Sequence, residues 1–444
     1  MANSTLPKTA IFAADLRIAV ARAAALLLIA LIGFAALPAD AQTFQVLHSF
    51  AGGRPGADPY SGLTMDRAGN LYGTTAYGGL TGSCFEGLGC GTVFKLTRAG
   101  SGWTLNPLYT FLGGNDGAFP EARVILGSDG SLYGTTAGGG GGTCTTVYYS
   151  GCGTVFKLIP AATACRGALC PWTETVLYRF TGSADGANPF YGDLVFDHAG
   201  NLYGTASIGG VLSCPAGNGK GCGVVFKLTP SSGGWTESVL YSFAGRPDGA
   251  FPYSGVIFDS AGNLYGTTYW GGADTNYGTV YELTSSGSAW TETILYSFLD
   301  GTVAQNPIGG LIFDGAGNLF GTGSSVYGSV FELTPGSGGW TFDLLYSLPG
   351  MGEFLGGPYG SLIMDTVGNL YGTTSNGGVY DHGTVFKLMP PQNDNWIYIP
   401  LHEFANGDDG GDPMGAVIQD ANGNLYGTAG GGAGGAGVVF EITP

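Results

Sequence analysis

Residue types that carry out acid–base, nucleophilic or metal chemistry are scarce in this sequence. No H-x-H or H-E-x-x-H metal-binding pattern includes any of the four histidines, which are His48, His198, His382 and His402. A G-x-S-x-G nucleophile elbow and a GK[ST] phosphate loop are also missing from the sequence. Carboxylates remain, and a glycosidase needs two of them about 5–9.5 Å apart. Asp116 and Glu121 are candidates for such a pair, and they would support a glycan-active hydrolase or lyase.

A second set of candidates follows a proline in a segment that recurs along the chain. Residues 248–252 (DGAFP) show the pattern, and related stretches cover 116–120 and 185–189. The residues after the prolines are Tyr60, Glu121, Phe190, Tyr253, Ile308, Tyr359 and Met414. Trp270, with Tyr269 and Tyr277 nearby, adds a further aromatic patch. Aromatic faces can stack on the apolar faces of sugar rings. We therefore expect a ligand site made of Tyr60, Glu121, Phe190, Tyr253, Tyr359 and Trp270, with packing between structural units as the alternative role of these residues.

Aspartates recur at one position of a predicted turn in six copies. They are Asp66, Asp197, Asp259, Asp314, Asp365 and Asp420, and Gly127 takes this place in the second copy. A calcium ion needs 6–8 oxygen ligands, whereas each of these carboxylates belongs to a separate unit. Capping of turn amides explains them better. We predict no metal site and no cofactor.

Three short strings recur along the chain and define a repeat. GNLYGT, with small variations, occurs seven times, and its first glycine is Gly69, Gly130, Gly200, Gly262, Gly317, Gly368 or Gly423. A GTVFKL-like string follows each copy, and a string such as WTETVLYSF follows six of them. Self-similarity of this kind indicates units that bury their apolar faces against their neighbours.

Each repeat holds four short strand candidates, termed A to D, and the fourth copy shows them most clearly. They cover residues 255–259 (GVIFD), 264–269 (LYGTTY), 279–283 (TVYEL) and 291–298 (TETILYSF). The turn at 259–263 supplies glycine and asparagine for positive φ. Four-stranded units that repeat every ~40–60 residues predict the blades of a β-propeller.

The two ends of the repeat region complement one another. The last repeat ends after strand C, at residues 438–442, whereas residues 43–50 (TFQVLHSF) form a spare strand D. That strand can complete the last blade, and closing the ring removes the edges that a linear array would expose. We therefore predict an all-β fold, with a single seven-bladed β-propeller of four-stranded blades over residues 42–444.

A glycine interrupts strand B in every repeat, although glycine weakens a strand unless packing requires it. We expect neighbouring blades to approach closely at this residue, which is Gly73, Gly134, Gly204, Gly266, Gly321, Gly372 or Gly427.

The eight cysteines fall into four near-neighbour pairs. We predict the local disulfides Cys84–Cys90, Cys144–Cys152, Cys165–Cys170 and Cys214–Cys222. Zinc binding is the alternative, but it favours shorter and more clustered C-x2-4-C spacings. Three pairs lie in B–C loops of the first three repeats, on the same predicted face as the D–A links. This face favours recognition, although the disulfides could also serve only to stiffen long loops.

Residues 1–41 have the pattern of an export signal. Lys8, Arg17 and Arg22 accompany an apolar run at 23–37, and residues 39–41 (ADA) predict cleavage before Gln42. The run of about 15 residues is short for a membrane span of ~20. We expect no membrane span in the mature chain, which would be secreted, at the cell surface or periplasmic.

Composition and charge narrow the class of protein further. The 84 glycines among 444 residues, with 44% hydrophobic and 13% aromatic residues, indicate a turn-rich β protein with a core rather than disorder. A net charge of −17 argues against a nucleic-acid partner, because binding to phosphates needs clustered Lys and Arg.

The repeated units D-x-x-GNLYGTT-x-x-GG, GTVF(K/E)LT and vLYsF-x-G-x-x-DGA-x-P resemble the GloVer tandem repeat of exported bacterial proteins. The resemblance covers residues 43–444 and implies an exported repeat protein, but no particular reaction. Members of this choice-of-anchor family end in surface anchors, whereas this sequence shows no clear C-terminal anchor, which favours release.

We predict a secreted, non-enzymatic binding or interaction propeller, whose ligand is a glycan or an extracellular protein. Two alternatives remain: a glycan-active hydrolase or lyase that uses loop-face carboxylates, and a structural protein of the envelope or matrix.

Overall fold

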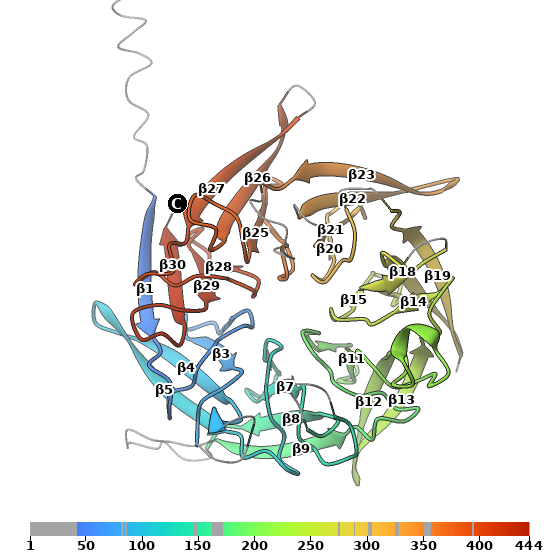
Figure 1. The fold of residues 1–444 in the computed structure, drawn as a ribbon, viewed down its shortest axis with the longest axis horizontal. Coiled ribbons are helices and arrows are strands. Elements are labelled where there is room, and N and C mark those ends of the chain that lie inside the picture. Colours follow the sequence, from blue (N-terminus) through green and yellow to red (C-terminus); the bar gives the residue numbers. More distant parts are fainter. Residues whose placement is uncertain are drawn as a thin grey trace, which may run out of the picture. The chain divides into compact units, whose positions relative to one another are not determined.

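Short antiparallel strands make up nearly all regular structure in the computed structural model of the chain. The structure describes residues 42–80, 84, 87–145, 150–161, 172–273, 276–287, 289–300, 304–324, 328–349, 357–392 and 395–443. The predicted signal at 1–41 lies outside these residues, and its boundary stays a prediction. Seven four-stranded sheets form a ring of blades around a central channel (Figure 1). The prediction of a seven-bladed β-propeller is therefore confirmed.

The first four blades follow the chain in the order A, B, C, D from the inner to the outer strand. Blade 1 comprises β2 (Thr64–Met65), β3 (Leu71–Thr75), β4 (Thr92–Ala99) and β5 (Gly102–Thr110). Blade 2 comprises β6 (Ile125–Leu126), β7 (Leu132–Thr136), β8 (Thr154–Ile159) and β9 (Thr173–Arg179). Blade 3 comprises β10 (Val195–Phe196), β11 (Leu202–Ala206), β12 (Val224–Ser231) and β13 (Gly234–Ser242). Blade 4 comprises β15 (Ile257–Phe258), β16 (Leu264–Thr268), β18 (Thr279–Ser286) and β19 (Ala289–Ser297).

The remaining blades differ only in how the last one is completed. Blade 5 comprises β20 (Ile312–Phe313), β21 (Leu319–Gly323), β22 (Ser329–Gly336) and β23 (Gly339–Ser347). Blade 6 comprises β24 (Ile363–Met364), β25 (Leu370–Thr374), β26 (Thr384–Gln392) and β27 (Asn395–Glu403). Blade 7 comprises β28 (Ile418–Gln419), β29 (Leu425–Ala429), β30 (Val438–Thr443) and, as strand D, β1 (Thr43–Ser49). Figure 1 shows β1, in blue, beside β30, in red, so the predicted closure of the ring is confirmed.

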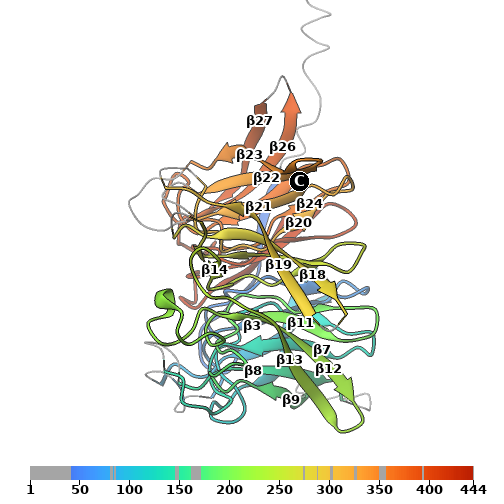
Figure 2. The same ribbon diagram turned by 90° about the vertical axis from the view of Figure 1, so that its right-hand side faces the viewer.

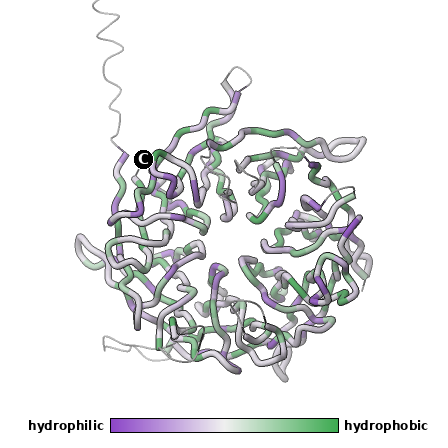
Figure 3. Tube along the Cα trace, viewed as in Figure 1, coloured by the Kyte–Doolittle hydropathy of each residue, from purple (hydrophilic) through white to green (hydrophobic). Residues whose placement is uncertain are grey.

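Among the residues that the structure describes, three short elements lie between blade strands. A two-stranded ribbon pairs β14 (Gly249–Ala250) with β17 (Trp270–Gly271), and η2 (Pro215–Gly217) is a single 3-10 turn. Figure 2 shows the ring of blades from its edge. Hydrophobic residues occur in every blade rather than in one sector (Figure 3). The core is accordingly a circle of clusters at the seams between neighbouring blades.

The glycine in strand B leaves room for an aromatic ring. In blade 3, a Cβ atom at Gly204 would lie 2.8 Å from the Phe226 ring and 2.8 Å from Leu194. Phe226 is the residue paired with Gly204 on the adjacent strand of the same blade. The expected crowding is thus present, but its source is the paired strand and not the neighbouring blade.

The aromatic ring that fits beside this glycine also packs across the seam between two neighbouring blades. Phe180, at the end of strand D in blade 2, meets Phe226 edge to face, with ring centroids 5.2 Å apart. Such pairs gain about 0.5–1.5 kcal/mol beyond their area burial. Five other seams carry the equivalent contact, through Phe50–Phe94, Phe111–Phe156, Phe243–Tyr281, Phe298–Phe331 and Phe404–Phe440.

The recurring aspartates cap the A–B turns, as predicted. Asp197 Oδ1 accepts hydrogen bonds from the backbone N–H groups of Ala199 and Asn201, both at 2.9 Å. Its Oδ2 accepts from Asn201 Nδ2 at 2.6 Å and from the Tyr203 hydroxyl at 3.1 Å. The backbone contact four residues on recurs at Asp66, Asp259, Asp314, Asp365 and Asp420.

Blade 2 caps its turn from a different position. Asp129 Oδ1 accepts from the backbone N–H of Ser131 at 3.0 Å, and its Oδ2 pairs with Lys157 Nζ at 2.7 Å. A Cβ atom at Gly127 would lie 2.8 Å from Asp129 Oδ1. The glycine that replaces the usual aspartate therefore makes space for the substitute cap.

We expect Gly204→Ala to destabilise the ring by about 1–3 kcal/mol, because the added methyl group would overpack the Phe226 ring and Leu194. The midpoint of urea unfolding measures this loss. Gly315→Ala is the matched control, since a Cβ atom there would meet nothing within 4 Å. Equal midpoints for the two variants would contradict the packing role of Gly204.

Candidate functional site

The links between strand D of one blade and strand A of the next place their residues at the central channel. The residue before the proline has a left-handed backbone in six of the seven links, as at Asn188 (φ 51°) and Phe251 (φ 58°). The proline then packs against the glycine that opens strand C of the preceding blade. A Cβ atom at Gly223 would lie 2.5 Å from Pro252 Cδ. This tight contact fixes the direction in which the chain enters strand A.

A cavity of about 300 Å³ occupies the channel where the seven A strands converge. Five of the seven residues that follow the prolines line it: Tyr60, Glu121, Ile308, Tyr359 and Met414. Further polar lining comes from Arg123, Tyr191 and Asp193. The volume is at the lower end of the range typical of small-molecule sites, ~300–1,000 Å³.

One side of the cavity continues into a cluster of aromatic rings, here called the aromatic wall. It consists of Phe190, Tyr191, Phe251, Tyr253, Tyr269, Trp270 and Tyr359. Tyr191 and Tyr359 meet at 6.4 Å between ring centroids, and Phe190 connects Tyr191 to Tyr253 at 4.2 and 5.8 Å. The wall therefore begins at the cavity, on the links that lead into blades 3, 4 and 6.

The outer half of the wall depends on the ribbon formed by β14 and β17. Tyr253 meets Tyr269 at 5.3 Å, and Tyr269 stacks on Trp270 at 6.0 Å with an interplanar angle of 23°. Pairing of Ala250 with Trp270 holds that indole in place. Trp270 is 38% exposed, so the wall runs from the buried cavity to solvent.

The structure brings the six predicted site residues into one region. Tyr60, Glu121 and Tyr359 line the cavity itself. Phe190 and Tyr253 stand beside it in the aromatic wall, and Trp270 forms the exposed end of that wall. Tyr277 belongs elsewhere, because its hydroxyl donates to Asp300 at 2.8 Å.

Sequence reasoning missed Tyr191, which lines the cavity and contacts Phe190 and Tyr359. Its hydroxyl reaches Met414 Sδ at 3.9 Å across the channel. Burial, together with the Glu121 carboxyl group and neighbouring tyrosines, raises the pKa of Tyr191 well above its ordinary value. The Phe190–Tyr191 doublet was the available signal, because only one of two successive residues can face the channel in an extended chain.

The charges around the cavity are unevenly divided. Arg123 Nη2 pairs with Asp193 Oδ2 at 2.8 Å, and the Arg123 backbone N–H donates to Asp193 Oδ1 at 3.0 Å. Glu121 is 3% exposed. Burial and the nearby Asp58, Glu121 and Asp412 carboxyl groups raise the pKa of Tyr60, and burial raises that of Tyr253 to about 12. All these hydroxyls are therefore protonated at neutral pH and can donate hydrogen bonds.

The two carboxylates considered for catalysis have different surroundings. Asp116 accepts from the Tyr109 hydroxyl and the Leu112 backbone N–H, both at 2.7 Å, and it interacts with Glu174 of the next outer strand. Glu121 lies at the cavity instead. Although they are close in sequence, the two residues therefore lie at opposite ends of one link.

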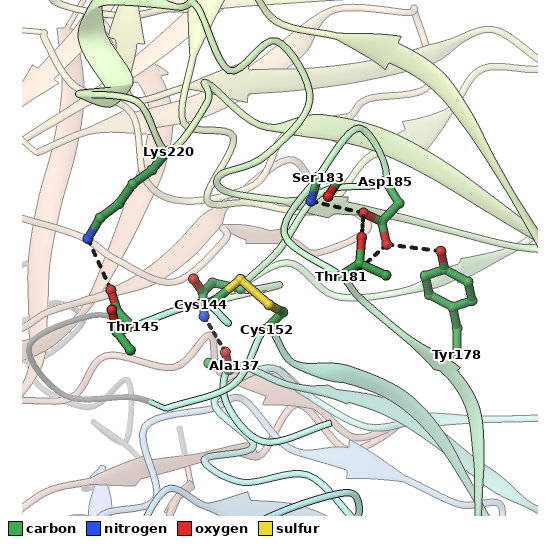
Figure 4. The surroundings of a disulfide bond; sticks show 10 residues. Ala137, Cys144, Thr145, Cys152, Tyr178, Thr181, Ser183, Asp185 and Lys220 are labelled. Carbon is green, nitrogen blue, oxygen red and sulfur yellow. Dashed lines mark hydrogen bonds between the residues drawn. A yellow bond between two sulfur atoms is a disulfide. The ribbon is translucent and has the colours of Figure 1, made fainter. Parts of the chain in front are cut away.

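Three of the four predicted disulfides are formed, and each braces a B–C loop. They are Cys84–Cys90, Cys144–Cys152 and Cys214–Cys222, while Cys165 and Cys170 lie outside the described residues. Figure 4 shows Cys144–Cys152 beside the link that carries Asp185. The predicted bracing of one loop face in blades 1 to 3 is confirmed, and it accords with an oxidising compartment.

Two kinds of site are not found in the part of the chain that the structure describes. No group of three or more His, Cys, Asp or Glu side chains there could hold a metal ion. No helix among these residues is long and apolar enough to cross a membrane.

The fold and the cavity define a seven-bladed propeller built from tandem repeats, with one candidate site at the channel. The sequence pattern of the Gloeobacter/Verrucomicrobia repeat matches residues 34–213, 211–338 and 322–444. The chain belongs to this repeat family, which confirms the resemblance seen in its repeated units. A search of curated proteins gave no match.

Several crystal structures are similar to the chain at low sequence identity. One is a "putative 6-phosphogluconolactonase" from Bacteroides uniformis, with 16% identity, a TM-score of 0.47 and coverage of 80% of this chain and 89% of that one. A protein of unknown function from Dyadobacter fermentans has 10% identity, a TM-score of 0.45 and coverage of 91% and 98%. The NanB sialidase from Streptococcus pneumoniae has 11% identity, a TM-score of 0.43 and coverage of 90% and 70%.

Proposed function

We propose that this protein is an exported, non-enzymatic binding module that holds a glycan at its channel. The aromatic wall carries the proposal, because it joins an exposed indole to a buried cavity through rings in mutual contact. Such a surface offers stacking faces to successive sugar rings, and the protonated tyrosine hydroxyls offer hydrogen-bond donors to their oxygens.

The size and setting of the site also favour a glycan over a folded partner. A cavity of about 300 Å³ can admit the end of an oligosaccharide but not a protein domain. The blades form a rigid frame, and the disulfide-braced loops lie on the face that carries the links. Binding residues are commonly presented in this way, on loops that a rigid scaffold holds in position.

The hydrolase alternative now depends on Glu121 with a partner other than Asp116. Asp193 lines the same cavity, but its carboxylate is engaged by Arg123 at 2.8 Å. If the purified protein cleaves an oligosaccharide, Glu121→Gln should abolish the turnover, whereas Asp343→Asn, on the outer strand β23, should leave it unchanged.

We expect Tyr253→Ala to weaken binding of a neutral oligosaccharide about tenfold or more, because Tyr253 links the two halves of the wall. A glycan panel read by thermal shift would identify the ligand, and titration calorimetry would measure the variants. Tyr380→Ala is the control, since Tyr380 is 58% exposed and lies outside the wall.

Unchanged affinity in Tyr253→Ala would show that the wall does not bind the glycan. No shift with any sugar would count against the proposal and favour a protein partner or a structural role in the envelope or matrix.

A further inference from the structure

The charge of the channel narrows the class of glycan. Arg123 is the one Lys or Arg that lines the cavity in the described part of the chain, and Asp193 engages it through two contacts. Glu121 is part of the same lining, and Asp58 and Asp412 lie close enough to Tyr60 to act on its hydroxyl. An approaching ligand therefore meets aromatic faces and an excess of carboxyl groups.

This combination favours a cation over an anion. A carboxylated or sulfated sugar would be repelled, whereas an ammonium group gains from the carboxylates and from the negative faces of tyrosine rings. We propose, resting on the proposed glycan site, that the channel selects basic sugars, namely oligosaccharides of glucosamine with free amino groups.

Two hexasaccharides that share the same ring and linkage test this selectivity. We expect the β-1,4-linked glucosamine hexamer to bind at least about tenfold tighter than its N-acetylated form at about pH 6, where its amino groups carry charge. Added salt should reduce this difference. Glu121→Gln should also reduce it, whereas Asp343→Asn, on the outer strand β23, should leave it intact.

Equal or tighter binding of the acetylated hexamer would overturn the selectivity but keep the glycan site. Binding of neither hexamer by the folded protein would overturn the proposed site itself.

Three successive seams each contain a tyrosine, an aspartate and a glutamate at their outer edge. Between blades 2 and 3, the Tyr178 hydroxyl donates to Asp185 Oδ2 at 3.0 Å, and the Thr181 backbone N–H donates to the same oxygen at 2.7 Å (Figure 4). Glu237, on strand D of blade 3, acts on Tyr178, and Asp185 acts on Glu237. The neighbouring seams repeat this tyrosine–aspartate–glutamate set as Tyr109, Asp116 and Glu174, and as Tyr241, Asp248 and Glu292.

Other seams place a ring where these three carry glutamate. Phe342 stacks on Tyr296 at 4.3 Å, and Tyr398 stacks on Tyr346 at 5.3 Å. Phe44 stacks on His402 at 3.7 Å. The position is thus one where side chains pack against the preceding blade. In agreement, the Oε1 atoms of Glu174, Glu237 and Glu292 are shielded from solvent and have no hydrogen-bond partner among the described residues.

An ionised glutamate is disfavoured at such a position. Burial, followed by the charge of the adjacent aspartate, raises the pKa of Glu174 and Glu237 to about 7 and that of Glu292 to about 8. The other groups that face them are the three seam tyrosines, Tyr281 beside Glu292, and Arg179, which acts in the opposite direction at Glu174. Glu292 and Asp248 share a hydrogen bond between their side chains, which requires one proton.

We infer that the seam between blades 3 and 4 is closed by a proton shared between Glu292 and Asp248, that Glu174 and Glu237 pack in the two preceding seams in their protonated form, and that all three seams loosen when these protons are lost. Each aspartate stands on a link that leads to the site: Asp116 precedes Glu121, Asp185 precedes Phe190, and Asp248 precedes Tyr253. Loss of these protons would therefore release the links that carry the buried carboxyl group and most of the aromatic wall.

The sign of the pH effect follows from the direction of the shifts. A glutamate whose pKa is raised in the folded state stabilises that state below its ordinary pKa, and the contribution disappears as pH rises through about 7–8. We expect the melting temperature to fall by about 5 °C between about pH 5.5 and 8.5, with half-exposure of the groups reducing the full linkage effect.

The triple variant Glu174→Gln, Glu237→Gln and Glu292→Gln tests the assignment, because glutamine keeps the shape and donates without a titrating proton. Its melting temperature should be nearly constant over this pH range. Glu282→Gln is the control, since Glu282 accepts a hydrogen bond from the Tyr265 hydroxyl at 2.8 Å outside these seams, and it should keep the wild-type slope. A wild-type melting temperature that does not fall with pH, or an unchanged slope in the triple variant, would overturn the inference.

Discussion

Neighbouring blades can pack together because the glycine in strand B, which has no side chain, leaves space for an aromatic ring of strand C. At Gly204, even one methyl group would lie 2.8 Å from Phe226. With that space kept free, Phe226 meets Phe180 of the preceding blade edge to face. The contact recurs in six of the seven seams, so these seams share one packing arrangement at this point. The candidate site lies on the loops and links, whose residues differ from blade to blade.

The links between blades determine which side chains of this regular ring line the candidate site. Each proline packs on a glycine of the preceding blade, and in six of the seven links a left-handed residue before the proline sets the entry into strand A. Seven such links deliver their side chains to one axis, yet the side chains themselves differ from link to link. The ring is therefore symmetric in its backbone and asymmetric in its chemistry, with the aromatic wall on the side of blades 3 and 4.

Much of the fold was predictable from the sequence, because every repeat has the same pattern of residues. The period of GNLYGT, the missing last strand and the spare strand at residues 43–50 together determine a closed ring. Three disulfides followed from cysteines only six or eight positions apart. These features depend on local spacing, which a single sequence displays directly.

The site was less predictable because its contacts join residues from different blades. Tyr191 lines the cavity where the backbone bends, so the Phe190–Tyr191 doublet shows that one of the two rings can face the channel but not which one. Asp116 and Glu121 are separated by Pro120, which sends them to different ends of the link. Glu174 interacts with Asp116 across a seam, and the two residues are 58 positions apart in the chain (174 − 116). No short motif therefore indicates the pair.

The completion of blade 7 by β1 has a consequence for how the molecule is assembled. The first strand to leave the ribosome pairs with the last, β30, so the contact of longest sequence separation is also the one that closes the ring. Contacts of this kind are slow to form, since the loop-closure entropy of almost the whole chain must be met first. Until then, β30 has an open edge and strand β1 has no sheet to join. A circular permutant in which the end of β30 is joined to the start of β1 would make this closing pair a local hairpin.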